Sequence, residues 1–237
     1  KSPSLTRRAS EGLHTKDKTP MRSVPPIIAL TATLLLSSLA AAQRPTPDRH
    51  FQDNADMPPG WVGQKQLTRG GPRPGYFQPV KVSGPVGSTV ALAEEGGFAP
   101  TDKSYAMAGM LIGQVYRLKG ANLRNHEGEE VFPTIEVIDR LYPPPGQEAR
   151  FPIPIELTEE ELRYALDGRY VLRVIYLEDV RSAPPVRQEP GEQRFTEIPP
   201  GHDAMLAADK LGRPMAILRM GSRVPLPEED QGQFLYQ

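Results

Sequence analysis

Prolines and glycines interrupt this chain so often that an all-helical bundle is disfavoured. The 237 residues include 27 prolines and 21 glycines, about a fifth of the chain against roughly an eighth in average usage. Proline breaks a helix because it lacks an N–H group and its ring clashes with the preceding turn. Beyond residue 75, apolar residues occur only in short runs between these breaks. The sequence therefore favours an all-β fold over a helical bundle.

The apolar runs after residue 75 are separated by turn residues at fairly regular intervals, which is typical of a β-sandwich. They predict one antiparallel sandwich domain over residues 76–224, followed by an acidic tail over 225–237. Near its end we expect a hairpin with Gly212 in the turn, and a short helix over 203–211 is the alternative. The expected strands are 77–82, 89–93, 111–118, 131–140, 151–157, 169–177 and 215–220.

A capping-box sequence predicts where one short helix begins. Thr158 can accept a hydrogen bond from the backbone of Glu161, whose carboxylate can reach back to the backbone of Thr158. The helix is expected over residues 159–166, and Gly168 supplies the left-handed conformation that ends it. The nearly continuous apolar run at 169–177 then predicts a central strand.

Two prolines predict an edge strand at residues 151–155. Alternation with a period of two places three apolar side chains on one face and Pro152 and Pro154 on the other. Each proline lacks an N–H group, so a neighbouring strand on that side would lose hydrogen bonds. The prolines also discourage aggregation through this edge.

Residues 166–174, Leu-Asp-Gly-Arg-Tyr-Val-Leu-Arg-Val, resemble the tyrosine corner of immunoglobulin-like sandwiches. In that motif the tyrosine hydroxyl bonds to a backbone group upstream. The resemblance implies an immunoglobulin-like β-sandwich in which Tyr170 has a structural role. The chain as a whole also resembles exported bacterial proteins that consist of a signal peptide, a proline-rich spacer and one β-domain. That resemblance implies a location and no activity.

The N-terminal third is expected to lie outside the folded domain. Residues 21–42 predict a signal peptide, because a positive residue, a short apolar run and small residues at a cleavage site follow one another. The apolar run is too short to span a membrane, and no cysteine is present to carry a lipid. Residues 1–20 predict a disordered upstream extension, and residues 43–75 an extended, proline-rich spacer. Trp61 in this spacer either docks on a partner or packs on the domain.

The residues that carry chemistry give no catalytic pattern. Without residues 1–42, which hold six basic and two acidic side chains, the formal charge falls from −1 to −5, which argues against nucleic acid as a partner. The absence of cysteine excludes thiolate metal sites, and His126 and His202 lack the spacing of zinc ligands. Copper binding is a minor alternative, because thioethers suit the cuprous ion. Its candidate ligands are Met107, Met110, Met205, Met215, Met220 and His202.

These observations favour an exported, non-enzymatic interaction or structural module of the cell envelope, without a cofactor. Its partner would be an envelope protein or a polysaccharide. The expected contact surface is the long loop at 179–201, the turn at 143–146, or an unprotected edge strand that pairs with a partner. A carbohydrate-binding sandwich is the alternative. The possible ligand or partner contacts are Trp61, Tyr105, Tyr142 and Phe195.

We predict that the mature protein begins at Gln43, because the small residues that precede it form the cleavage site. Mass spectrometry of the N-terminal peptide from the native cell measures this directly. A mature N-terminus at any other residue would contradict the assignment.

Overall fold

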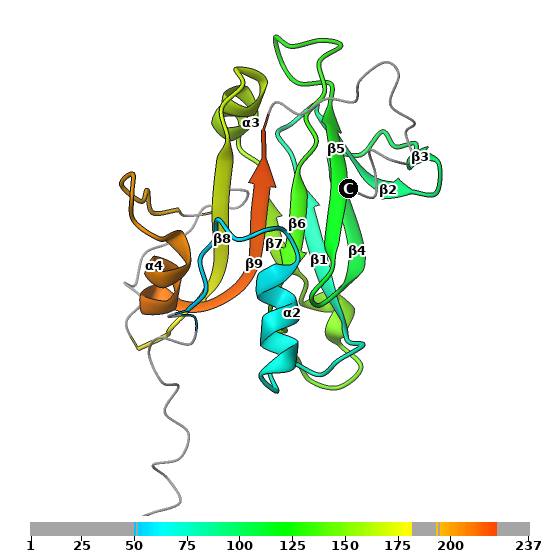
Figure 1. Cartoon of the computed structure of the whole chain (residues 1–237). Coiled ribbons are helices and arrows are strands. Elements are labelled where there is room, and N and C mark those ends of the chain that lie inside the picture. The colour runs from blue at the N-terminus through cyan, green and yellow to red at the C-terminus, as the bar shows by residue number, and fades with distance from the viewer. Residues whose placement is uncertain (1–49, 51, 182–192, 194, 222–237) are drawn as a thin grey trace, which may run out of the picture. The chain divides into compact units, whose positions relative to one another are not determined.

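The computed structural model describes residues 50, 52–181, 193 and 195–221 (Figure 1). The extension at 1–20, the signal peptide at 21–42 and the tail at 225–237 lie outside these residues and stay predictions. Most of the central part of the predicted 179–201 loop also lies outside them.

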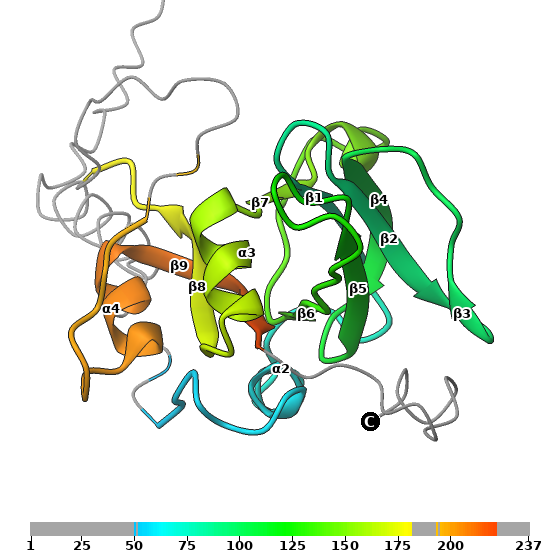
Figure 2. The same ribbon diagram turned by 90° about the horizontal axis from the view of Figure 1, so that it is seen from above.

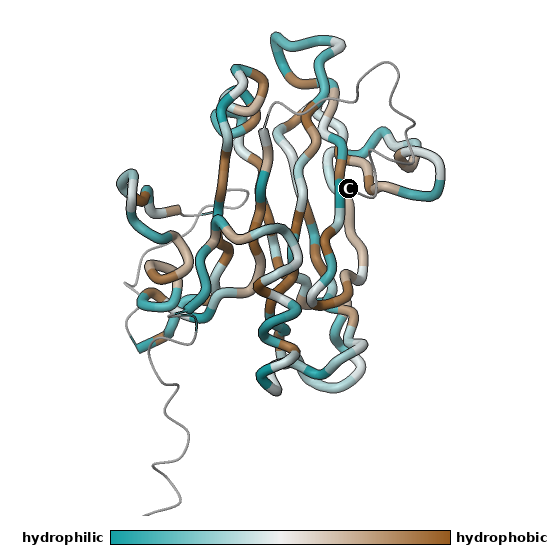
Figure 3. The backbone as a smooth tube through the Cα atoms, viewed as in Figure 1, coloured by the Kyte–Doolittle hydropathy of each residue, from teal (hydrophilic) through white to brown (hydrophobic). Residues whose placement is uncertain are grey.

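Two β-sheets face each other across one apolar core, so the expected all-β sandwich architecture is confirmed. The strands are β1 (Phe77–Ser83), β2 (Thr89–Glu94), β3 (Gly97–Phe98), β4 (Tyr105–Leu111), β5 (Val115–Ala121), β6 (Thr134–Val137), β7 (Ile153–Glu156), β8 (Val171–Glu178) and β9 (Gly212–Met220). One sheet has the order β4-β1-β7 and the other β3-β2-β5-β6-β9-β8. Buried aliphatic and methionine side chains from both sheets form the core. Figure 3 shows hydrophobic stretches along the strands.

Within the described residues, three α-helices and one short 3-10 helix (Glu148–Arg150) accompany the strands, so the expectation of a single helix is wrong. They are α2 (Trp61–Thr68), α3 (Glu159–Leu166) and α4 (Ala204–Leu211). Helices α2 and α4 lie on the outer face of the six-stranded sheet, away from β1, β4 and β7 (Figure 2). Helix α4 corrects the expected hairpin, because Asp203 caps a helix and Gly212 begins β9.

Helix α3 has the bounds and the cap that the sequence predicted. The Thr158 hydroxyl accepts a hydrogen bond from the Glu161 N–H at 3.2 Å, and the Glu161 carboxylate accepts one from the Thr158 N–H at 3.0 Å. Gly168 has a φ of 81°, the left-handed conformation expected of it. These features depend only on neighbours in the sequence.

Strand β7 confirms the predicted edge, because β1 is its only strand neighbour among the described residues. The pairing of β1 with β7 is parallel, which corrects the expectation of a purely antiparallel sandwich. The expected strand at 111–118 is wrong as well. A turn at Gly113, where φ is 81°, divides that segment between β4 and β5. The strand expected at 131–140 is shortened to β6.

The segment before β1 packs on the domain, which corrects the prediction of a flexible spacer at 43–75 for residues 52–75. Ala55 and Val62 are fully buried against β8, β9 and α4. A Cβ atom on Gly63 would lie 2.7 Å from the Cα atom of Gly113, so only glycine permits this close approach. Because the outer face of the six-stranded sheet is apolar, it requires this cover.

A buried ion pair fastens this N-terminal segment to the sheet. Glu136 on β6 accepts hydrogen bonds from the Gly63 N–H at 2.8 Å and from Nη1 of Arg219 at 2.9 Å. Nη2 of Arg219 on β9 donates to the carbonyl oxygens of Ala55 and Met57, at 3.1 and 3.3 Å. Both charged groups are thus hydrogen-bonded as well as paired, as buried charges must be.

A second polar cluster surrounds the buried carboxylate of Asp53. Lys65 on α2 and Arg69, the C-cap of α2, pair with it at 2.7 and 2.8 Å, and Nδ1 of His50 lies 3.2 Å away. Burial alone would raise the pKa of Asp53, but the hydrogen bonds from Lys65 and His50 and the nearby positive charges outweigh burial and lower the pKa. The cluster therefore stabilises the fold above the ordinary aspartate pKa of about 3.9 and loses that stabilisation as the pH falls through the lower folded-state pKa.

We predict that Glu136→Ala lowers the free energy of unfolding by about 3–5 kcal/mol, because it leaves the buried Arg219 guanidinium without a counter-charge. Urea unfolding followed by circular dichroism measures the loss. The matched control is Glu130→Ala, whose carboxylate pairs with Lys119 at 3.0 Å on the surface and contributes at most about 1 kcal/mol. Equal losses in the two variants would contradict the role given to the buried pair.

Candidate functional site

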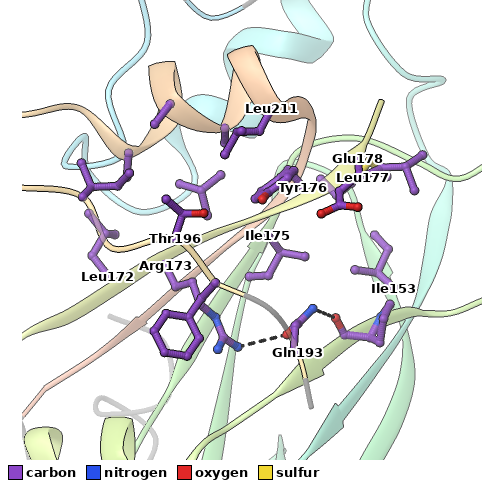
Figure 4. Close-up of a pocket in the computed structure, with 18 of the residues that line it drawn as sticks. Ile153, Leu172, Arg173, Ile175, Tyr176, Leu177, Glu178, Gln193, Thr196 and Leu211 are labelled. Atoms are coloured by element: carbon purple, nitrogen blue, oxygen red, sulfur yellow. Dashed lines mark hydrogen bonds between the residues drawn. The ribbon is translucent and has the colours of Figure 1, made fainter. Parts of the chain in front are cut away.

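A groove of about 640 Å³ runs along the outer edge of β8 (Figure 4). We call it the β8 groove. Strand β8 forms its floor, α4 and residues 195–198 form its sides, and the start of β7 closes one end. Most of its lining is apolar. Its apolar lining includes Ile153, Leu172, Val174, Ile175, Leu211 and Met215.

The alternation of side chains along β8 explains the course of the groove. Leu172 and Val174 belong to the cluster under α4, whereas Ile175 belongs to the core between the sheets. Successive side chains of a strand point to opposite faces. Because residues from both faces line the groove, it follows the edge of the strand rather than either face.

Strand β8 is an edge strand, which corrects the prediction of a central one. Among the residues that the structure describes, β9 is the one strand that pairs with it. The apolar run suggested a central strand because both faces of β8 are covered, by the core on one side and by α4 on the other. The apolar run of β8 thus indicates that both faces of the strand are covered. It does not indicate that both of its edges are paired.

Arg173 links the edge of β8 to β7 and α3. Its Nη1 atom donates to both carboxylate oxygens of Glu161, at 2.8 and 3.1 Å, and its Nη2 atom donates to the carbonyl oxygen of Glu156 at 2.7 Å. Burial lowers the pKa of the Arg173 guanidinium, and the negative charges of Glu161 and Glu156 oppose that effect. Arginine nevertheless stays protonated. The carboxylate that caps α3 therefore also anchors this guanidinium.

The amide of Gln193 covers the outer edge of β7 in the way that a neighbouring strand would. Its Nε2 donates to the carbonyl oxygen of Pro154 at 2.9 Å, and its Oε1 accepts from the N–H of Glu156 at 3.1 Å. A primary amide offers a donor and an acceptor, as a peptide unit does. Figure 4 shows this amide between Arg173 and the start of β7. Side chains, and no described strand, fill the gap between β7 and β8.

The structure distributes the four predicted contact residues over separate places. Phe195 lines the β8 groove with 57 % of its surface exposed. Trp61 is the first residue of α2 and is equally exposed, Tyr105 lies on β4, and Tyr142 follows β6. The sequence reasoning missed Arg173 and Gln193. The sequence pattern could have identified Arg173, because it is the one charged residue on the core-facing side of an apolar strand.

Tyr170 precedes β8 and is 62 % exposed. Burial raises the pKa of Tyr170, and the positive charge of Arg219 partly opposes this. Among the described residues, no hydrogen bond joins the Tyr170 hydroxyl to the upstream backbone group that a tyrosine corner implies. The electrostatic influence of Arg219 places Tyr170 near the buried ion pair of the six-stranded sheet.

The structure does not bring the proposed copper ligands together. Met107 is exposed on the outer face of β4, whereas Met110 points into the core. Met205 and Met215 lie in different apolar clusters. Within the described ranges, no group of three or more histidine, aspartate or glutamate side chains is arranged to hold a metal ion. His50, expected outside the domain, is buried beside Asp53.

No family model, curated protein or solved structure matches this chain. In the described part of the chain, no helix combines the length and the apolar character needed to cross a membrane.

We predict that Arg173→Met destabilises the protein by about 3 kcal/mol, because it leaves the half-buried Glu161 carboxylate without its cation and the Glu156 carbonyl without a donor. Thermal and urea unfolding measure the change. Arg163→Met is the matched control, since Arg163 pairs with Glu160 on the exposed side of the same helix at 3.9 Å. A control as unstable as Arg173→Met would show that the loss does not come from the buried contacts.

Proposed function

We propose that this chain is an exported, non-enzymatic binding module of the cell envelope that holds an extended segment of a partner protein in the β8 groove. The observation that carries the proposal is the edge of β8, which lies in an apolar groove. An extended peptide that adds to such an edge gains backbone hydrogen bonds, and its alternate side chains enter the pockets beside the strand.

The dimensions and lining of the groove support this mode of binding. About 640 Å³ lies within the range of roughly 300–1,000 Å³ that is usual for binding pockets, and it accommodates a few side chains of a bound segment. Leu177, which is 47 % exposed, and Phe195 offer apolar surface at the rim. We therefore expect apolar residues at alternate positions of the bound segment.

The polar groups of the groove suggest how the segment is oriented. Arg173 is already paired with Glu161 at one end, whereas Glu178 is exposed where β8 ends. A basic residue of the partner beside Glu178 would fix the direction of the segment by charge complementarity. The net negative charge of the chain beyond residue 42 also favours a basic residue in the bound segment.

Two further parts of the proposal begin from sequence patterns. Export depends on residues 21–42. The immunoglobulin-like relationship depends on residues 166–174 and is supported, at the level of architecture, by two facing sheets. Neither part is needed for the binding of a peptide at β8.

The test uses residues 43–237 and a displayed library of unstructured peptides, followed by hydrogen exchange with the tightest peptide. We expect slower amide exchange at residues 172–178 and unchanged exchange at β3, the opposite edge of the same sheet. Leu177→Asp should weaken binding about tenfold by placing a charge at the rim of the groove. Val86→Asp, at a fully exposed turn outside the groove, should leave affinity unchanged.

Protection confined to the three-stranded sheet, or equal affinities for the Leu177→Asp and Val86→Asp proteins, would overturn the proposal. Failure of every library peptide to bind would overturn it as well.

A further inference from the structure

A stack of aromatic and guanidinium groups lies outside the β8 groove. The Cζ atom of Arg140 lies 4.2 Å from the ring centroid of Tyr76, just before β1, and 4.5 Å from that of Tyr142. The Cζ atom of Arg213, at the start of β9, lies 5.4 Å from the Tyr142 ring. The chain thus gathers two cations and two aromatic rings from three distant segments.

The hydrogen-bonding edge of Arg140 is left without a described acceptor. Contact with aromatic rings uses the faces of a guanidinium group and leaves its N–H bonds directed outward in its own plane. No residue in the described ranges accepts a hydrogen bond from this side chain, and its Nε atom is enclosed without a partner. The two Nη atoms are not enclosed in this way, so they are the donors that a ligand can reach, and no described acceptor competes for them.

The guanidinium of Arg140 has no described counter-charge. Arg213 donates to Oδ2 of Asp139 at 3.0 Å, whereas Oδ1 of Asp139 accepts from the backbone N–H of Arg140 at 2.7 Å. Among the described residues, Asp139 therefore pairs with the Arg213 guanidinium, and no ion pair holds the Arg140 guanidinium. An anion with two coplanar oxygens matches the fork of an arginine side chain.

The geometry points to a binding site for a uronate unit of an acidic polysaccharide, formed by Tyr76, Arg140 and Tyr142. The carboxylate of the sugar meets the N–H edge of Arg140. The sugar ring lies against Tyr142, which is 66 % exposed and supplies a flat apolar surface with a polar tip. A glutamate side chain of a peptide would use only the guanidinium, whereas a uronate uses both features.

The site differs in place and in ligand from the β8 groove. It also assigns a role to Tyr142, which the sequence singled out and the peptide groove leaves unused. The proline run that follows Tyr142 offers no N–H donors of its own, so Arg140 and the tyrosine hydroxyls supply the donors for the ligand.

The experiment titrates trigalacturonate into residues 43–237 and follows the Arg140 Nε–Hε signal by NMR together with the heat of binding. Arg140→Lys keeps the charge but loses the planar fork, and Tyr142→Ala removes the exposed ring. Each should weaken binding about tenfold. Two control variants should stay within about twofold. They are Arg124→Lys, at an exposed turn, and Tyr105→Ala, an exposed ring that lies beside Lys81 and Lys103.

Three outcomes would overturn the inference. They are no binding of trigalacturonate, equal binding of its methyl ester, which lacks the charge, and equal binding of a hexaglutamate peptide, which lacks the sugar ring. Because Tyr142 is exposed, Tyr142→Ala keeps the test valid if Arg140→Lys fails to fold. Leu177→Asp should bind trigalacturonate normally, so failure of the peptide groove and failure of this site are distinguishable.

Discussion

The buried pair of Glu136 and Arg219 is the interaction on which the rest of the structure depends. Removing two charges from water is costly unless every oxygen and N–H group finds a partner. The pair meets that requirement only with backbone groups of the N-terminal segment, at Ala55, Met57 and Gly63. Helix α2 has eight residues and would be unstable alone. The sheet therefore needs the segment to neutralise its charges, and the segment needs the sheet to hold its helix.

Features determined by neighbours in the sequence could be predicted, and those determined by distant contacts could not. The cap at Thr158 and the proline edge at β7 are local, and both were correct. The proline-rich composition of residues 43–75 predicted a spacer because nothing nearby reveals that Val62 meets the apolar outer face of β9. The same limit explains β8. Its apolar run indicates that both faces are covered, whereas the lack of a second strand neighbour among the described residues depends on where the other strands lie.

The two proposed sites show the same difference between what the local sequence predicts and what distant contacts determine. Exposed aromatic residues could be named from their turn-rich surroundings, but only Phe195 reached the β8 groove, which joins β7, β8 and α4 from distant parts of the chain. Tyr142 became informative only when the fold placed Arg140 and Arg213 against its ring and Tyr76 against Arg140. Residue type identified the candidate residues. The contacts that the fold gives to each of them decided which ones belong to a site.

The contact between the N-terminal segment and the last helix bears on how quickly the protein folds. The His50 N–H donates to Asp209 across a separation of 159 residues, and Arg219 reaches Ala55 across 164. Contacts between such distant residues close large loops, and chains that depend on them fold slowly. The fold also cannot be completed before β9 has been synthesised. A chain that folds this slowly stays longer in a state that can be threaded through a narrow translocation pore, so slow folding is compatible with the export that we propose from residues 21–42.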